Sequence, residues 1–135
     1  MGIAFVAHSP MANGYLTGKY DGNSEFDKKN DYRSFMPQFK EADKNKELLE
    51  LLQSIAEKKY ATPAQISLAW MMSKGIIPIP GTRKLNRLEE NAATADITLS
   101  ADETAEIDAK LSIMEMSDVF GGHRLKKTAA HEQLP

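Results

Sequence analysis

The sequence predicts an α/β fold in which two parallel strands are joined by helices. Its 135 residues are enough for one domain with a hydrophobic core and too few for two. Two short apolar runs, at positions 3–7 and 76–80, are separated by two segments whose apolar residues follow helical spacing. Two further helical segments follow the second run. Strands separated by helices imply right-handed crossover connections in a parallel sheet.

The first strand is expected at positions 3–7, where Ile3 to Ala7 are all apolar. Such a run suits a strand that is buried on both faces, as strands of parallel sheets are. From Asn13 to about Asp43 the chain is polar and rich in Gly, Asp, Asn and Lys. We expect a long loop there without elements of its own, and a loop of that length is usually functional or mobile.

Two helices are expected between the strands. Apolar residues such as Leu48 and Leu52 recur at helical spacing and predict an amphipathic helix over 45–59. The segment Thr62-Pro63-Ala64-Gln65 has the sequence of a capping box with proline at the first helical position. The second helix therefore begins there, and it is expected to end at Gly75.

The second strand is expected at 76–80, although its two prolines each remove a ladder donor. A helix over 85–95 should follow. Ser100-Ala101-Asp102-Glu103 forms a second capping box and should open a helix that buries Ile107. Residues 118–135 contain two adjacent glycines and many polar residues, so an irregular tail is expected there. Positions 1–135 would thus form a single region.

Composition excludes several classes of protein. Seventeen basic and nineteen acidic side chains give a net charge of −2, which lacks the broad positive footprint of a nucleic-acid-binding protein. Cysteine is absent, so disulfides, thiolate metal sites and thiol catalysis are excluded. No apolar stretch approaches the ~18 residues that a membrane span requires. We expect a cytoplasmic chain with no membrane or nucleic-acid partner and no metal site.

The stretch after the second strand carries candidate anion-binding residues. Gly81 would let an anion approach the backbone, and the N-terminus of the following helix would favour negative charge. A hydroxyl and three cations follow, and the two arginines would share a helix face: Thr82, Arg83, Lys84 and Arg87. Glu90 and Asn91 come next and could bond to an adenine. The alternative is a solvated basic first turn, which the helix dipole disfavours unless an anion is present.

The stretch after the first strand is the second candidate site, because ligands of α/β folds bind at the carboxyl ends of strands. It reads His8-Ser9-Pro10-Met11-Ala12-Asn13-Gly14-Tyr15-Leu16-Thr17-Gly18-Lys19-Tyr20. Ser9, Asn13 and Thr17 offer hydrogen bonds, and Lys19 supplies a cation. The alternative interpretation is an ordinary turn built from small residues.

Taken together, the two stretches closely resemble the C-terminal part of the aldo-keto reductases, from Gly2 to about Leu125. The first stretch resembles the loop after that family's seventh barrel strand. The run Ile-Pro-Ile-Pro-Gly-Thr-Arg resembles the family's signature after strand eight, and the helix that begins at Thr62 resembles the one between them. The resemblance implies a partial (β/α)8 TIM barrel, a C-terminal fragment with two parallel strands and about four helices.

The resemblance also implies NADPH as the cofactor. The pyrophosphate and the neighbouring ribose would be wrapped by Ser9, Pro10, Met11, Ala12 and Asn13. Lys19 would close over the phosphates, and Arg33 is a further candidate contact. The 2′-phosphate would be held by Gly81, Thr82, Arg83 and Lys84. Arg87 would flank the adenine, and Glu90 and Asn91 would bond to it. His8 stands where relatives commonly place an aromatic residue on the nicotinamide.

The family's catalytic Asp, Tyr, Lys and His belong to earlier barrel strands and have no match in this chain. No catalytic residue is therefore assigned, and whether the chain is itself an enzyme stays open. The first interpretation is that the chain is the NADPH-binding portion of an aldo-keto reductase, which in its complete form would reduce aldehydes or ketones. The alternative is a non-enzymatic module that associates with itself or binds a nucleotide. In either case, apolar strands without neighbours predict self-association.

Overall fold

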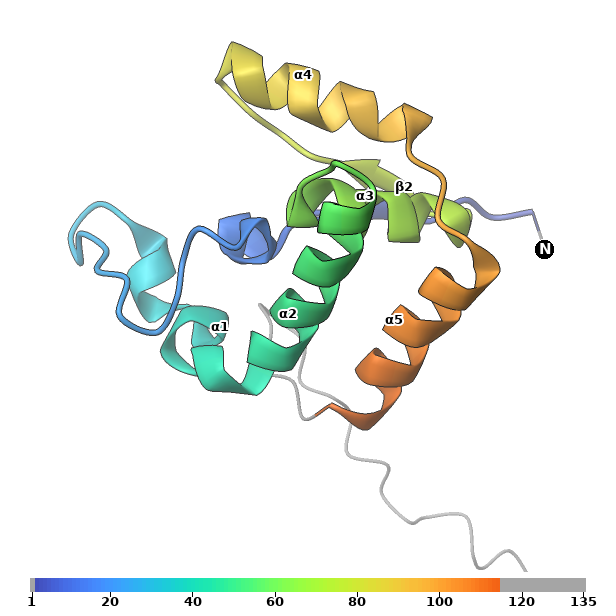
Figure 1. Cartoon of the computed structure of the whole chain (residues 1–135). Helices are drawn as coiled ribbons and strands as arrows, with labels where there is room; N and C mark the ends of the chain where they lie inside the picture. Colours follow the sequence, from blue (N-terminus) through green and yellow to red (C-terminus); the bar gives the residue numbers. More distant parts are fainter. Residues whose placement is uncertain (1, 115–135) are drawn as a thin grey trace, which may run out of the picture.

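The computed structural model describes residues 2–114, and these form a mixed α/β structure (Figure 1). The expected class, two parallel strands with several helices, is confirmed, and it corresponds to part of a (β/α)8 barrel. The expected irregular tail at 118–135 lies outside the described residues, as do two of the three histidines, His123 and His131, neither of which matches the catalytic His of the family that the sequence resembles. The elements in chain order are β1 (Val6–His8), η1 (Ala12–Thr17), η2 (Tyr32–Phe35), α1 (Pro37–Lys40), α2 (Ala42–Lys58), α3 (Pro63–Ser73), β2 (Ile77–Ile79), α4 (Leu85–Ala93), η3 (Thr94–Asp96) and α5 (Ala101–Ile113).

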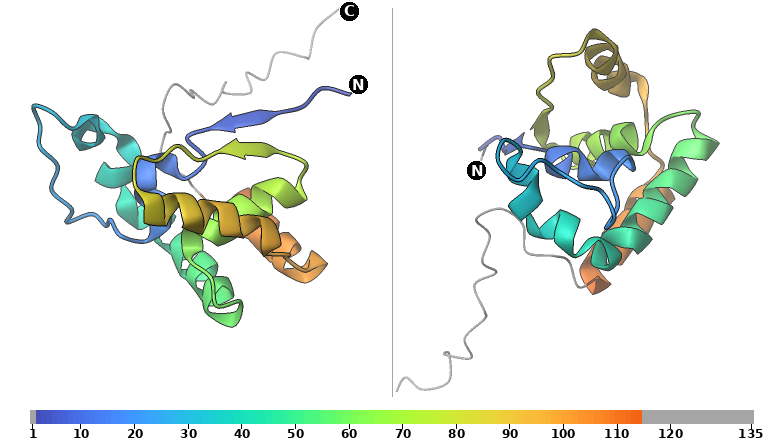
Figure 2. Two further views of the ribbon diagram at one scale, coloured as in Figure 1. Left: turned by 90° about the horizontal axis from the view of Figure 1, so that it is seen from above. Right: turned by 90° about the vertical axis from the view of Figure 1, so that its left-hand side faces the viewer.

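The two strands pair in parallel, as predicted, and Figure 2 shows them side by side. Ala7 lies opposite Pro78 at the centre of the register. Both strands are shorter than the apolar runs that predicted them, because only three residue pairs face each other. The expected burial on both faces is wrong: Phe5 is 65% exposed and Val6 is 52% exposed. Among the described residues β1 has one neighbouring strand only, so its other edge has no strand partner.

The segment expected to be a loop without elements contains η1, η2 and α1, so that expectation is wrong. The segment has a small core of its own, in which the ring of Phe39 packs at 4.8–5.9 Å from three other aromatic rings: Tyr15, Tyr20 and Phe26. The Tyr15 hydroxyl donates to the carbonyl of Ala42 at 2.9 Å, which ties η1 to the first turn of α2. Helix α2 therefore begins at Ala42, earlier than position 45.

The main core lies between α2, α3 and α5, and its centre is fully buried at Ile55 and Ile66. The Thr62 hydroxyl accepts from the backbone of Gln65, whose side chain accepts from the backbone of Thr62, so the predicted capping box is confirmed. Helix α3 ends at Ser73, and Gly75 follows it with a φ of +72°. Thr62 thus fixes where the chain enters the helix that precedes β2.

The last two helices follow the sequence prediction closely. The predicted helix over 85–95 is α4, with its final turn in the 3-10 form of η3. The capping box at Ser100 opens α5, which buries Ile107 as expected. The Trp70 indole N–H donates to Asp108 at 2.9 Å, and Lys74 pairs with the same carboxylate, which ties α3 to α5. The bond from Lys74, and then that from Trp70, lowers the pKa of Asp108.

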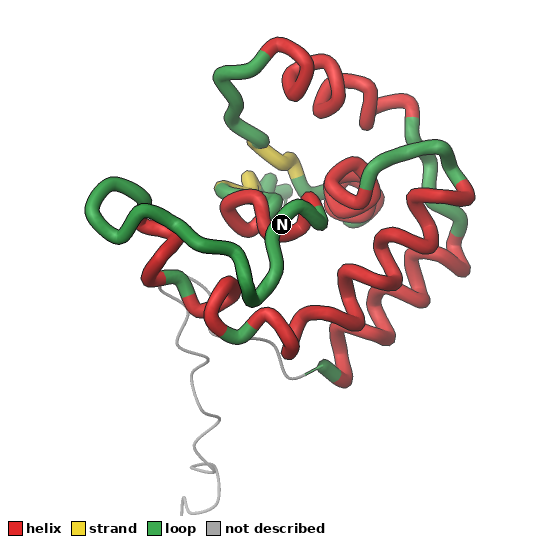
Figure 3. Tube along the Cα trace, turned by 60° about the vertical axis from the view of Figure 1, so that its left-hand side comes forward, coloured by secondary structure: helices red, strands yellow, loops and turns green. Residues whose placement is uncertain are grey.

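Helix α4 stands apart from the main core and is joined to the rest of the chain by two loops (Figure 3). Its apolar side chains are poorly covered, with Leu85 71% exposed and Leu88 55% exposed. An apolar groove of about 530 Å³ separates it from α3 and β2. None of the helices within residues 2–114 combines the length and the apolarity that a bilayer crossing would need.

We predict that the 135-residue chain associates in solution, because the exposed apolar strand residues and strand edges favour pairing with another chain. Light scattering should give a mass above the 15.0 kDa of one chain. Replacing Ile3 and Phe5 together with lysine should lower that mass. The control is Ile113→Lys, which adds a charge at another exposed apolar residue away from the strands. A uniform 15.0 kDa species with cooperative thermal unfolding would contradict the prediction.

Candidate functional site

The carboxyl ends of β1 and β2 lie side by side and open into a cavity of about 830 Å³. Parallel pairing has this effect because both strands then end at the same edge of the sheet. The cavity joins the segments after the two strands, so that Ser9 and Gly81, which are 72 positions apart in the sequence, line the same space. Its lining consists of His8, Ser9, Pro10, Met11, Asn13, Gly14, Tyr20, Arg33, Pro78, Ile79, Pro80, Gly81 and Arg87.

A second cavity of about 190 Å³ lies beside the first and shares Met11, Gly81 and Arg87 with it. This smaller cavity is bounded by the N-terminus of α3 and by one side of α4. The residues that line it are Met11, Thr17, Lys19, Thr62, Pro63, Ala64, Gly81, Thr82, Arg87, Glu90 and Asn91. The two cavities together suit an elongated ligand, with Arg87 in the wall between them.

The structure brings most of the predicted site residues together. Seven line the larger cavity: Ser9, Pro10, Met11, Asn13, Arg33, Gly81 and Arg87. Four more line the smaller cavity: Lys19, Thr82, Glu90 and Asn91. The remaining three line neither cavity: Ala12, Arg83 and Lys84. The carbonyl of Ala12 accepts from the side chain of Gln38 at 3.4 Å, and both basic residues are exposed.

The backbone after β1 turns sharply through the left-handed region. Ser9, Ala12 and Asn13 have φ values of +51°, +48° and +57°, which residues other than glycine rarely adopt. Gly14 follows with a φ of +97°, and a Cβ atom there would lie 3.3 Å from the Tyr20 ring. This unusual turn holds residues 9–14 against the strand ends, and strain of this kind is often found at binding sites.

The segment after β2 differs from the sequence prediction in one respect. Lys84 is the N-cap of α4 and has extended backbone angles, so Arg83 precedes the helix. Arg83 and Arg87 therefore do not share a helix face, as their spacing suggested. The Thr82 hydroxyl accepts from the backbone N–H of Lys84 at 3.2 Å and shapes the turn. No side chain caps the first N–H groups of α4, and its first turn carries no acidic residue.

Glu90 and Asn91 have internal partners that the sequence did not reveal. The Glu90 carboxylate accepts from the Thr62 hydroxyl at 2.7 Å, and its backbone carbonyl accepts from the Gln65 side chain at 2.8 Å. The Asn91 amide donates to the carbonyl of Pro80 at 3.3 Å. These bonds tether α4 to α3 and to the end of β2. Both side chains still line the smaller cavity.

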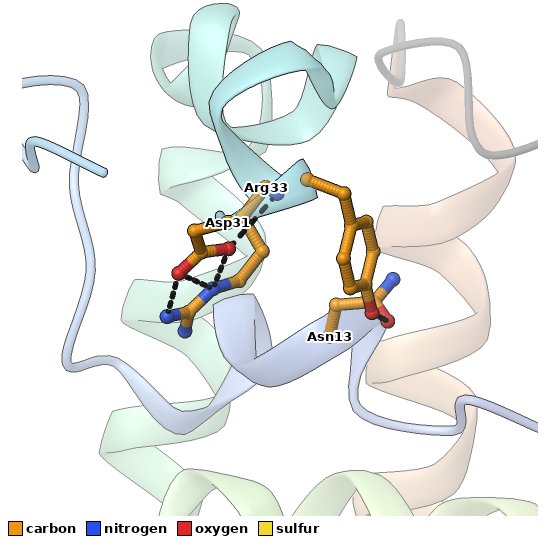
Figure 4. Close-up of polar contacts among 4 residues, drawn as sticks. Asn13, Asp31 and Arg33 are labelled. Atoms are coloured by element: carbon orange, nitrogen blue, oxygen red, sulfur yellow. Dashed lines mark hydrogen bonds and ion pairs between the residues drawn. The ribbon is translucent and has the colours of Figure 1, made fainter. Parts of the chain in front are cut away.

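Arg33 reaches the larger cavity from η2 and is held by two kinds of contact. Its Nε donates to both oxygens of Asp31, at 2.9 and 3.0 Å, and its Nη2 lies 2.5 Å from Oδ2 (Figure 4). Its guanidinium also lies over two aromatic rings, 5.0 Å from the centre of Tyr20 and 4.6 Å from that of Phe26. The hydrogen bonds to Asp31 raise the pKa of Arg33, and the same bonds lower the pKa of Asp31.

Sequence reasoning missed the neighbours of Arg33. Asp31 is the N-cap of η2 and accepts from the backbone of Arg33, and the Tyr32 hydroxyl donates to Asn13 at 2.8 Å. The only signal was an aspartate two positions before an arginine, which is common in turns. The sequence predicts no metal site, and within residues 2–114 no group of three potential metal-binding side chains is found.

The chain is an α/β protein with a cleft at the ends of its parallel strands, lined by cations, hydroxyls and strained backbone, and clefts at this place are where α/β proteins typically bind ligands. The sequence model of the Aldo/keto reductase family matches residues 1–112 of this chain. The chain therefore belongs to the aldo/keto reductase family, and the resemblance seen in its motifs is confirmed.

Three relatives show how the match is distributed. "Aldo-keto reductase str7" of Strobilurus tenacellus is 41% identical over 134 residues, which cover 96% of this chain and 38% of the relative. "Probable aldo-keto reductase 1" of Glycine max is 36% identical over 126 residues, which cover 90% of this chain and 35% of the relative. "Aldo-keto reductase yakc [NADP(+)]" of Schizosaccharomyces pombe is 37% identical over 102 residues, which cover 73% of this chain and 30% of the relative. The chain thus spans about a third of the length of these relatives.

We predict that Thr62 stabilises the smaller cavity through both of its hydroxyl bonds. Thr62→Ala should lower the free energy of unfolding by about 1–2 kcal/mol, because the N-cap of α3 and the bond to Glu90 are both lost. Urea denaturation followed by circular dichroism measures the change. Thr62→Ser keeps the hydroxyl and is the control. Equal urea midpoints for the two variants would show that the hydroxyl contributes nothing.

Proposed function

We propose that this chain, as a single region, holds NADP(H) across its two joined cavities and is the cofactor-binding portion of an aldo-keto reductase. The observation that carries the proposal is the position of the cations. Arg33 and Arg87 line the larger cavity, and Lys19 with Arg87 lines the smaller one, all beside the carboxyl ends of the strands. Membership in the family, and the NADP(+) in the printed name of one relative, support the same cofactor.

The donor set fits a phosphorylated dinucleotide. Such a ligand needs cations and N–H or O–H donors near three phosphate groups, with a less polar surface for its rings. Thr82 and Lys19 provide donors in the smaller cavity, and Pro10, Met11 and Pro80 provide apolar surface. A Cβ at Gly81 would meet no other atom within 4 Å, so the backbone between the two cavities is open to a ligand.

The roles follow the order of the residues along the two cavities. Residues 9–13, with Lys19 and Arg33, would hold the pyrophosphate and its ribose. Residues 81–84 would hold the 2′-phosphate, with the exposed side chains of Arg83 and Lys84 folding back onto it. Arg87 would flank the adenine. Glu90 and Asn91 would meet the adenine while keeping their bonds to Thr62 and Pro80.

In the complete enzyme the bound nicotinamide would supply a hydride to an aldehyde or ketone, with a tyrosine as proton donor. The residues of this chain would bind and orient the cofactor for that step. His8 lines the larger cavity at the end of β1 and would lie against the nicotinamide ring. None of the tyrosines or histidines in the chain matches the family's catalytic pair.

A second candidate function is a non-enzymatic module that associates with itself. The observation in its favour is the exposure of apolar strand residues, including Ile77 at 51% and Ile79 at 49%. The two candidate functions differ in whether they depend on a bound nucleotide. The module would assemble equally well with and without NADPH. Light scattering at increasing NADPH concentration distinguishes them when it is combined with the binding experiments below.

We predict negligible carbonyl reductase activity for the 135-residue chain alone. The reason is the missing proton donor and its partners, each of which contributes by orders of magnitude. The assay follows NADPH oxidation with a panel of aldehydes and ketones. Turnover at roughly 1 per second or more, an ordinary enzyme rate, from verified pure chain would contradict the prediction.

We predict that the chain prefers NADPH over NADH and that the preference depends on Arg83. A phosphate–arginine pair is charge-assisted and contributes roughly 1.5–3 kcal/mol. Arg83→Ala should therefore weaken NADPH binding by roughly tenfold or more in a fluorescence titration and leave NADH binding nearly unchanged. Lys46→Ala is the control, because Lys46 is an exposed cation on α2 that lines neither cavity. An equal loss of affinity for both nucleotides would show that Arg83 does not bind the 2′-phosphate.

A further inference from the structure

Among the described residues that line the two strand-end cavities, Met11 alone contains sulfur. Together with Gly81 and Arg87 it lines both cavities, so this residue lies in the wall that they share. In the proposed function Met11 takes part only as one of residues 9–13, and the chemistry of its sulfur has no role. A thioether is apolar, but oxidation converts it into a strongly polar sulfoxide.

The five methionines within residues 2–114 differ in how far they are exposed. Met11 and Met71 are half-buried, and Met72 is 37% exposed. Met36 and Met114 are buried, with 3% and 9% of their surface exposed. Because an oxidant must reach the sulfur, the first three should react before the last two. Of the first three, only Met11 lies at the strand-end cavities, whereas Met72 lines the apolar groove beside α4.

The backbone of Met11 is fixed by the turn that follows it. Its carbonyl accepts from the backbone N–H of Gly14 at 3.0 Å and from that of Leu16 at 3.3 Å. Met11 is also the N-cap of η1. A chemical change at the sulfur leaves these backbone bonds intact. Its effect therefore falls on the two cavities and not on the course of the chain.

The charges around Met11 determine how a sulfoxide there would act. Arg87 lines both cavities, Arg33 lines the larger one and Lys19 lines the smaller one. No carboxylate side chain of the described residues lines the larger cavity. A sulfoxide oxygen carries partial negative charge and accepts hydrogen bonds, so it would bond to these cations and compete with a phosphate group for them.

We propose that Met11 is an oxidation site and that its conversion to the sulfoxide weakens the binding of the dinucleotide. This inference rests on the proposed function. The sulfur attacks one oxygen of hydrogen peroxide, an S–O bond forms as the O–O bond breaks, and the second oxygen takes up the proton of the first and leaves as water. The sulfur loses two electrons, and the peroxide gains them. A methionine sulfoxide reductase, with a dithiol as the reductant, reverses the change.

The test treats the full chain with hydrogen peroxide, removes the peroxide, and measures NADPH and NADH binding by nucleotide fluorescence. The oxidised chain should bind both nucleotides about three- to tenfold more weakly, because the sulfoxide occupies a donor that would otherwise bond to a phosphate. Peptide mass spectrometry should find Met11 oxidised before Met36 and Met114. Bound NADP(+) covers the shared wall of the cavities, so it should slow the oxidation of Met11 and leave that of Met72 unchanged.

Two leucine variants identify the residue that is responsible, and each chain is compared with itself before treatment. Met11→Leu keeps an apolar side chain of similar size without sulfur, so peroxide should not change its affinity. Met72→Leu is the matched control, because it removes an exposed sulfur from the apolar groove and should leave the chain as sensitive as the unmodified one. Incubation with a methionine sulfoxide reductase should restore binding to the oxidised chain.

The outcomes separate the oxidation site from the proposed function. If the untreated chain binds neither nucleotide, the proposed function is contradicted, and the role of Met11 with it. If the chain binds and keeps its affinity after mass spectrometry shows Met11 oxidised, the role of Met11 alone is contradicted. An equal loss of affinity in treated Met11→Leu would also contradict it, since another residue would then be responsible. Oxidation of Met36 ahead of Met11 would show that the oxidant does not reach the Met11 sulfur.

Discussion

The parallel pairing of β1 with β2 is the constraint on which the rest of the structure depends. The amide of Ile77 donates to the carbonyl of Phe5 at 2.9 Å, and three residue pairs follow in register. Parallel strands cannot be joined by a tight turn, so the chain between them must cross from one end of the sheet to the other. Every element from η1 to α3 belongs to that crossing. The same constraint places both strand ends at one edge, where the cleft forms.

Stability and binding are distributed unevenly over the molecule. Apolar packing concentrates between α2, α3 and α5, where Ile55 and Ile66 are fully buried. The wall formed by α4 depends more on polar contacts, since Thr62 bonds to Glu90 and Asn91 bonds to Pro80. Hydrogen bonds fix distances and angles more strictly than apolar contacts do. The cleft is therefore shaped at one side by a helix whose position is set by a few directed bonds.

Local signals in the sequence predicted the helices and the strands. Several contacts that were not predicted join residues that lie far apart in the chain. Helical periodicity and two capping boxes placed α2, α3 and α5 to within a few residues, and the positions of the strand ends located the cleft. The sequence did not predict the partners of Glu90 or the core around Phe39. These depend on residues up to about 28 positions away, which pattern reasoning within one segment does not connect.

The bond between Trp70 and Asp108 determines what the fluorescence of this protein can report. The chain contains one tryptophan, and its indole lies where α3 meets α5, away from the residues that line the two strand-end cavities. The wavelength of its emission therefore follows solvent entry between these two helices. Separation of α5 from α3 would shift the emission to the red while the strand ends stayed paired. Intrinsic fluorescence and nucleotide fluorescence thus observe two different parts of the same molecule.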